Sequence, residues 1–103
     1  MSRDALELEE IAALSVRYRR LGFDVCVDSP VEESGLRADI LVRKGGRTLI
    51  IEVKNAQSLR SEAERVKALI RYSDAHPPMR FDLVLANPPA KRRRKPKASA
   101  ATA

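Results

Sequence analysis

Two consecutive glycines, Gly45 and Gly46, stand between two apolar segments and constrain the fold of this chain more than any other feature. Residues 38–42 and 48–54 both have the apolar, β-branched composition of strands. A glycine pair between two such segments is typical of a two-residue turn, because both turn positions of a preferred hairpin type require a positive φ. The sequence therefore predicts an antiparallel β-hairpin that turns at the two glycines.

The hairpin turn determines which side chains lie opposite one another. With two residues in the turn, Leu41 pairs with Ile50 and Asp39 pairs with Glu52. Directly opposed residues project from the same face of a sheet, and Lys54, two positions beyond Glu52, projects from that face as well. We therefore expect two carboxylates and one ammonium group to lie together on one face of the hairpin.

The two carboxylates need compensating charge, since like charges directly opposite each other repel. Glu52 also lies in the apolar run of residues 49–53, where a buried, unpaired charge costs on the order of several kcal/mol. Lys54 supplies one positive charge. A divalent cation would supply the rest, because carboxylate oxygens are the ligands that Mg²⁺ prefers. The alternative is an exposed edge strand with a local salt bridge, but neighbouring strands predicted on both sides favour the metal site.

The rest of the chain alternates between helical and strand patterns. Apolar residues recur at helical spacing in two segments, and two further short apolar runs are bounded by Gly or Pro. The expected elements are a helix over 4–21, a strand over 23–27, a loop over 28–37, a helix over 58–75 and a strand over 81–86. A helical crossover makes the last two strands parallel. The order predicts an α/β fold with a mixed four-stranded sheet flanked by helices.

Positive charge is concentrated near the C-terminal end. The formal net charge is +6 and the pI is near 10.0, which favours polyanionic partners such as nucleic acid or acidic membrane surfaces. Six positively charged residues in this segment equal the whole net charge in number: Lys91, Arg92, Arg93, Arg94, Lys95 and Lys97. We expect one domain over residues 1–90 and a basic, disordered tail over 91–103. The tail is either a solvated extension or a source of salt-sensitive phosphate binding.

The composition also bears on disulfides, membrane segments and the mode of nucleic-acid binding. The single cysteine, Cys26, excludes an intramolecular disulfide and is expected to be a small buried residue. No apolar stretch reaches transmembrane length, and the acidic N-terminal segment lacks the apolar region of a signal peptide. We therefore expect a cytoplasmic protein without a membrane segment. The absence of Trp argues against aromatic stacking on single-stranded nucleic acid.

Asp39 and the Glu52-Val53-Lys54 tripeptide together resemble the D…E-x-K signature of the PD-(D/E)xK nuclease superfamily. This superfamily includes restriction endonucleases, archaeal Holliday-junction resolvases and related repair nucleases. The predicted order of elements over residues 4–87 also resembles the superfamily's restriction-endonuclease-like αβββαβ core. The motif alone is short and degenerate, whereas motif, topology and hairpin register together are fairly specific.

The resemblance implies a metal-dependent nuclease that hydrolyses DNA phosphodiester bonds, as an endonuclease or exonuclease, in restriction, repair or recombination. Asp39 and Glu52, with the backbone carbonyl of Val53, would ligate Mg²⁺ or Mn²⁺. Lys54 would orient the attacking water and offset charge in the transition state, while the metal lowers the pKa of that water. DNA is the expected partner, and so small a chain is compatible with a homodimer or with a partner subunit.

The resemblance also implies a glutamate from the first helix and a glutamine near the lysine. Glu10 is our choice of glutamate, because it lies one turn before the inward-facing Leu14. Glu7 and Glu9 are the alternatives, and all three also suit the positive end of the helix dipole. Gln57 matches the glutamine, although a surface-loop residue is the simpler interpretation.

A second class of function stays open on the sequence alone. The same fold can act as a catalytically silent module that binds nucleic acid or protein within a larger complex. A chain of 103 residues leaves little room for a separate specificity domain, which is compatible with this alternative. Titration with a divalent metal separates the two, because only the nuclease requires the cation.

Overall fold

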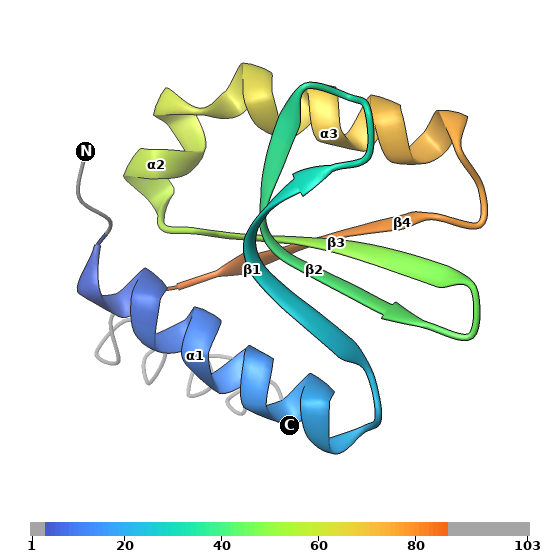
Figure 1. The fold of residues 1–103 in the computed structure, drawn as a ribbon. Coiled ribbons are helices and arrows are strands. Elements are labelled where there is room, and N and C mark those ends of the chain that lie inside the picture. The colour runs from blue at the N-terminus through green and yellow to red at the C-terminus, as the bar shows by residue number, and fades with distance from the viewer. Residues whose placement is uncertain (1–3, 87–103) are drawn as a thin grey trace, which may run out of the picture.

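The structure of the protein is a computed structural model, which describes residues 4–86. Its elements are α1 (Ala5–Arg20), β1 (Asp24–Val31), β2 (Leu36–Lys44), β3 (Arg47–Lys54), α2 (Ala56–Ser61), α3 (Ala63–Ala75) and β4 (Arg80–Leu85). The sheet order is β1-β2-β3-β4, in which β2 is antiparallel to β1 and β3, whereas β3 and β4 are parallel. Helix α1 covers one face, and α2 and α3 cover the other (Figure 1). The predicted α/β fold is confirmed.

The β2–β3 hairpin has the predicted register. Leu41 pairs with Ile50, and the two turn glycines have φ values of 58° and 79°. This left-handed conformation is one that glycine adopts without steric cost, which explains the glycine pair. The regular pairing ends at Ile40 and Ile51, so the strands separate where the predicted carboxylates begin.

The segment 28–37, predicted as a loop, is mostly strand. Strand β1 runs to Val31 and β2 begins at Leu36, so only a short turn lies between them. β1 is an edge strand, which tolerates Pro30 and polar side chains that resemble a loop in sequence. Cys26 lies on the same strand and is exposed. The prediction that Cys26 is buried is therefore wrong, because an edge strand leaves part of its length in solvent.

The second predicted helix, 58–75, is divided into α2 and α3. Helix α2 begins at Ala56, where Asn55 and Ser58 form a capping box: each side chain accepts a hydrogen bond from the other residue's backbone N–H. Glu62 then separates the two helices, with a non-helical φ of −114° and ψ of 23°. No Gly or Pro marks this interruption, so the helical periodicity of the sequence does not reveal it.

From Ile40 onward, alternate residues of β2 and β3 enter two separate cores. The core beneath α1 contains Ile11, Leu14, Ile40, Val42, Ile51, Val53 and Ala86. The core beneath α3 contains Val31, Ala38, Leu41, Ile50 and Leu69. Full burial of one such aliphatic side chain contributes about 1.5–3 kcal/mol. Because strand side chains alternate between faces, Asp39 and Glu52 project toward α2 and α3, on the same face as Leu41 and Ile50.

Asp4 caps the start of helix α1. One Asp4 carboxylate oxygen accepts hydrogen bonds from the N–H groups of Leu6 at 3.1 Å and Glu7 at 3.4 Å, which satisfies donors that the first helical turn cannot pair internally. Gly22 follows the helix with a φ of 92°. Within residues 4–86, no helix is long and apolar enough to cross a membrane.

Candidate active site

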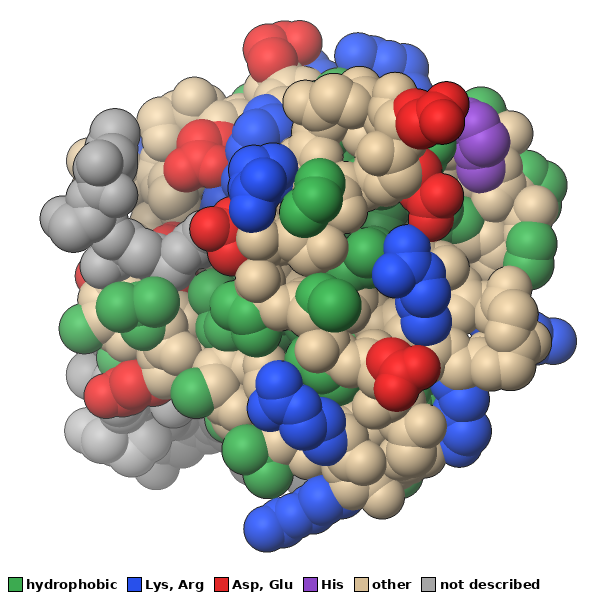
Figure 2. All heavy atoms as spheres, in the orientation of Figure 1, with side chains coloured by type: hydrophobic (Ala, Val, Ile, Leu, Met, Phe, Trp, Pro, Cys, Tyr) green, Lys and Arg blue, Asp and Glu red, His purple; other side chains and the backbone are tan. Residues whose placement is uncertain are grey.

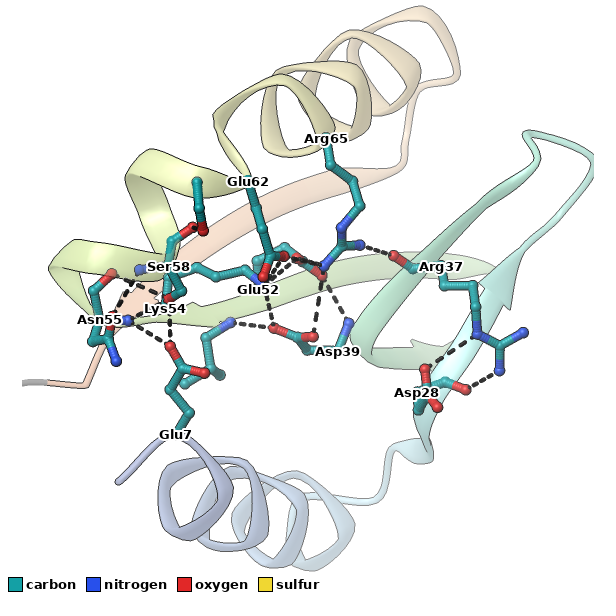
Figure 3. Close-up of polar contacts among 12 residues, drawn as sticks. Glu7, Asp28, Arg37, Asp39, Glu52, Lys54, Asn55, Ser58, Glu62 and Arg65 are labelled. Carbon is teal, nitrogen blue, oxygen red and sulfur yellow. Dashed lines mark hydrogen bonds and ion pairs between the residues drawn. The ribbon is translucent and has the colours of Figure 1, made fainter. Parts of the chain in front are cut away.

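Asp39, Glu52 and Lys54 lie together at the open end of the β2–β3 hairpin (Figure 3). The Lys54 Nζ atom is 3.6 Å from Asp39 Oδ2 and 3.5 Å from Glu52 Oε1. All three side chains are almost inaccessible, with exposed fractions of 0% for Glu52 and Lys54 and 3% for Asp39. The structure thus brings together the three residues that the hairpin register predicted.

The two carboxylates also replace the strand pairing that ends just before them. The backbone N–H of Asp39 donates to Glu52 Oε2 at 2.7 Å, and the backbone N–H of Val53 donates to Asp39 Oδ2 at 2.8 Å. Each side chain therefore satisfies a main-chain donor of the neighbouring strand, which would otherwise be costly to bury. These bonds hold one oxygen of each carboxylate in place and determine how both groups are oriented.

Two residues that the sequence analysis did not identify complete the cluster. Arg65, from the first turn of α3, places its Nη2 atom 2.9 Å from Glu52 Oε1 and 3.0 Å from Glu62 Oε1. The same atom lies 3.9 Å from Asp39 Oδ1. Glu62 in turn accepts a hydrogen bond of 2.7 Å from Lys54 Nζ. Three carboxylates and two cations thus form one network, whose outer members come from the α2–α3 junction.

Burial and neighbouring charges act on this network in opposite directions. Burial raises the pKa of Glu52, and repulsion from Asp39 adds to the effect, although Arg65 and Lys54 oppose it. The pKa of Glu62 is lowered, mainly because Lys54 donates a hydrogen bond to it. Partial burial would lower the pKa of Arg65, but the attraction of Glu52 and Glu62 raises it overall. Glu52 is therefore the carboxyl group that the fold disfavours in its charged form.

Glu7, and not the predicted Glu10, is the glutamate on the buried face of α1. Its Oε2 atom accepts hydrogen bonds from the backbone N–H of Asn55 at 2.7 Å and from the Ser58 hydroxyl at 2.5 Å. Glu10 is only half-buried. The difference arises because α1 docks on the sheet through the face that contains Glu7 and Ile11, which leaves Glu10 at the margin. Glu7 therefore connects α1 to the segment directly after Lys54.

The other predicted contact residues lie away from this cluster or outside the described residues. Gln57 is exposed on the first turn of α2 rather than in a loop. The basic residues of the tail lie outside the described residues, as does the domain boundary predicted at residue 90: Lys91, Arg92, Arg93, Arg94, Lys95 and Lys97. Acidic and basic side chains are interspersed over the face shown in Figure 2, so no single basic patch dominates that face.

A groove of about 330 Å³ adjoins the cluster. Its lining residues come from β1, the turn that follows, β2 and α3: Asp28, Gly35, Leu36, Arg37, Ala38, Asp39 and Arg65. Asp39 and Arg65 belong to both the groove and the cluster. The Arg37 guanidinium pairs with Asp28 at 3.1 Å, and both side chains are more than half exposed. The groove therefore gives solvent molecules and ligands a route to the edge of the carboxylate pair.

The donor set is chemically suited to a divalent cation. Arg65 Nη2 lies 3.9 Å from Asp39 Oδ1 and 2.9 Å from Glu52 Oε1. A positively charged group is therefore already close to both carboxylates. Oxygen atoms from two carboxylates are the ligands that Mg²⁺ and Mn²⁺ prefer. Within residues 4–86, however, no group of three His, Cys, Asp or Glu side chains is arranged to hold a metal. A metal here would rely on two carboxylates, main-chain oxygen and water.

The mixed sheet, the flanking helices and the Asp39, Glu52 and Lys54 cluster define a restriction-endonuclease-like domain of the PD-(D/E)xK type. A protein-family model described as AHJR-like (REase_AHJR-like) matches residues 1–103. The chain therefore belongs to this family. Neither the curated proteins nor the solved structures contain a significant match to it. Membership supports nuclease activity in general, and nucleases of this type act on DNA and generally use divalent metals.

Proposed function

We propose that this protein is a nuclease that hydrolyses DNA phosphodiester bonds with the help of Mg²⁺ or Mn²⁺. The observation that carries the proposal is the position of Lys54 Nζ, within 3.6 Å of both Asp39 and Glu52, beside a groove that Asp39 lines. Burying a lysine and two carboxylates carries a desolvation cost, and buried charge clusters of this kind are concentrated at functional sites. The family match supports the same class of activity.

Asp39 and Glu52, with the backbone carbonyl of Val53, would hold the divalent cation. The cation would polarise the phosphate and lower the pKa of a water molecule. The two carboxylates are already oriented for this role, because the backbone N–H groups of Val53 and Asp39 each hold one of their oxygens. Such preorganisation removes a reorganisation cost when the reaction begins.

Lys54 would act on the reacting phosphate and water. Its ammonium group has three hydrogen-bond donors and no acceptor, so it can orient a water oxygen and stabilise negative charge that develops on the phosphate. One donor is directed at Glu62, at 2.7 Å, and the side chain is fully buried. When substrate binds, Lys54 would redirect at least one of its donors toward the phosphate.

Glu7 has a positioning role in this proposal, and Glu10 has none. The Glu7 carboxylate accepts the backbone N–H of Asn55, the residue after Lys54. It also accepts the Ser58 hydroxyl, which links it to the capping box of α2. Glu7 thereby holds the end of β3 against α1 and limits how far Lys54 can move.

A cleavage assay tests the proposal. Purified protein should cut duplex, branched or single-stranded DNA in Mg²⁺ or Mn²⁺, and Asp39→Asn, Glu52→Gln and Lys54→Met should each reduce the rate by at least about a hundredfold. Matched controls are Asp82→Asn and Lys67→Met, which alter exposed residues and should leave the rate unchanged. Equal cutting by the wild type and the site variants would contradict the proposal.

A second candidate is a catalytically silent module that binds nucleic acid or protein. The observation in its favour is that Lys54 and Arg65 already compensate the carboxylates within the chain. Calorimetric titration with Mn²⁺, with and without DNA, separates the two functions. Absence of binding at millimolar Mn²⁺ in both conditions would favour the silent module over the nuclease.

The basic residues at 91–97 of the tail would add non-specific affinity for DNA. Its six positive charges can each release a counterion from the DNA on binding. A chain that ends at residue 90 should therefore bind a duplex more weakly and with a shallower dependence on salt concentration. An unchanged salt dependence would indicate that the tail serves another partner.

A further inference from the structure

Arg65 occupies a boundary between two environments. On one side its Nη2 atom contacts Glu52 and Glu62. On the other side the residue lines the groove, and 32% of its side chain is exposed. Within residues 4–86, Arg65 is the arginine that both contacts the carboxylate pair and lines the groove. The guanidinium can therefore leave the carboxylates without crossing the protein interior.

In the arrangement described, Arg65 takes the place of an added cation. Its Nη2 atom lies 2.9 Å from Glu52 Oε1 and 3.9 Å from Asp39 Oδ1. These two oxygens are the ones that the backbone N–H groups of β2 and β3 leave facing the α2–α3 side. A guanidinium at this position lies on the side from which a divalent cation would approach the two oxygens, and the two positive charges would repel each other at so short a distance. Metal binding at Asp39 and Glu52 is consequently coupled to the departure of Arg65.

The groove offers Arg65 a second position and a second kind of anion. Arg65 Nη1 already donates to the backbone oxygen of Arg37, so its outer edge points along the groove wall. The Arg37 side chain, which also lines the groove, bonds to the carboxylate and the backbone oxygen of Asp28. Both side chains are exposed, and exposed ion pairs contribute little. Arg37 and Arg65 both line the groove, and a guanidinium can bind a phosphate through paired N–H groups.

We propose that Arg65 exchanges between the carboxylates of the site and a backbone phosphate of the bound nucleic acid. In the free protein it compensates Glu52 and Glu62. In the complex it binds the phosphate in the groove beside Arg37, which leaves Asp39 and Glu52 to the divalent cation. The exchange couples DNA binding to metal binding, and it rests on the proposed nuclease function.

The first test measures metal affinity without DNA. In Arg65→Met the competing cation is gone, so titration calorimetry should show Mn²⁺ binding about tenfold more tightly than in the wild type, if Arg65 leaves the carboxylates free about a tenth of the time. The matched control is Arg37→Met, which removes a groove arginine without touching the carboxylates. Its Mn²⁺ affinity should equal that of the wild type.

The second test measures DNA affinity. Fluorescence anisotropy with a labelled duplex in Ca²⁺, with the duplex checked afterwards for integrity, should show weaker binding for Arg65→Met and for Arg37→Met. Loss of one phosphate contact should also reduce the slope of log affinity against log salt concentration by about 0.9. Arg65→Met should thus shift metal affinity and DNA affinity in opposite directions, whereas damage to the fold would weaken both.

Arg65→Lys provides a second variant if Arg65→Met does not fold. It keeps the positive charge but loses the planar group that reaches Glu52 and Glu62 together, so Mn²⁺ should bind more tightly than in the wild type by a smaller factor. Equal or weaker Mn²⁺ binding in the folded Arg65 variants, or unchanged DNA binding in Arg65→Met, overturns the exchange. If the wild type binds Mn²⁺ and the variants bind it equally, the nuclease proposal stands while the role of Arg65 falls. If none of them binds Mn²⁺, both fall.

Discussion

The two ends of the β2–β3 hairpin are held together by different chemistry. At the closed end, regular backbone pairing continues up to a two-residue glycine turn. At the open end, the pairing stops at Ile40 and Ile51, and the side chains of Asp39 and Glu52 bond to the main chain of the opposite strand. The closed end depends on residues adjacent in the chain, whereas the open end depends on the charges of Glu62 and Arg65, which the α2–α3 junction and α3 bring to it.

The largest expected effect concerns the charge balance of the open end. Lys54→Met removes a fully buried cation that lies near three carboxylates. Removing one partner of a buried ion pair typically costs about 3–5 kcal/mol, so urea denaturation at neutral pH should show a loss of this size. Lys67→Met, at an exposed pair with Glu64, should change the free energy of unfolding by less than about 0.5 kcal/mol. Similar losses of stability in both variants would contradict the view that the buried charges of the open end matter more than exposed ones.

The next effect concerns the bonds that replace strand pairing. Asp39→Ala leaves the buried N–H of Val53 without its carboxylate acceptor, and a lost partner of this kind costs about 1–3 kcal/mol. Hydrogen exchange at the Val53 amide should accelerate, while the amide of Leu41, within the regularly paired part of the hairpin, should change less. Equal acceleration at both positions would mean that the two ends unfold as one unit.

A smaller effect is expected at the closed end. Gly46 has a φ of 79°, and a β-carbon added there would meet no atom within 4 Å. Gly46→Ala should therefore cost about 1–2 kcal/mol through backbone strain alone, as measured by thermal denaturation. Metal affinity should not change, because the turn lies at the far end of the hairpin from the carboxylates (Figure 1). A change in metal affinity would show that the two ends are coupled.

The smallest effect is a pH dependence at Glu52, whose pKa is raised chiefly by burial. A carboxyl group with a raised pKa binds its proton more tightly in the folded protein. Its favourable contribution is therefore complete below the ordinary pKa of 4.5 and is lost as pH rises through the raised value. Glu52→Gln should be more stable than the wild type at neutral pH, and the difference should shrink as pH falls toward 4.5. A difference that grows with acid would contradict the raised pKa.

The helix glutamate shows where sequence reasoning reached its limit. Glu7 lies one turn before Ile11, and Glu10 lies one turn before Leu14. Both apolar residues are in the core, so helical spacing alone supports either glutamate. Burial of Glu7 depends on how α1 rests on the sheet and on the N–H of Asn55 and hydroxyl of Ser58 that meet its carboxylate. These partners lie about 50 positions away in the chain, and no local pattern indicates them.

The sequence by itself determined the hairpin register and the grouping of Asp39, Glu52 and Lys54, because a glycine turn and the alternation of strand side chains are local properties. Only the tertiary structure decided which charges compensate them. Leu69 is fully buried against the sheet and holds α3 so that Arg65, one turn earlier, reaches Glu52. The break at Glu62 adds the third carboxylate. Such counter-charges depend on how a helix packs after a crossover, which residue spacing alone does not specify.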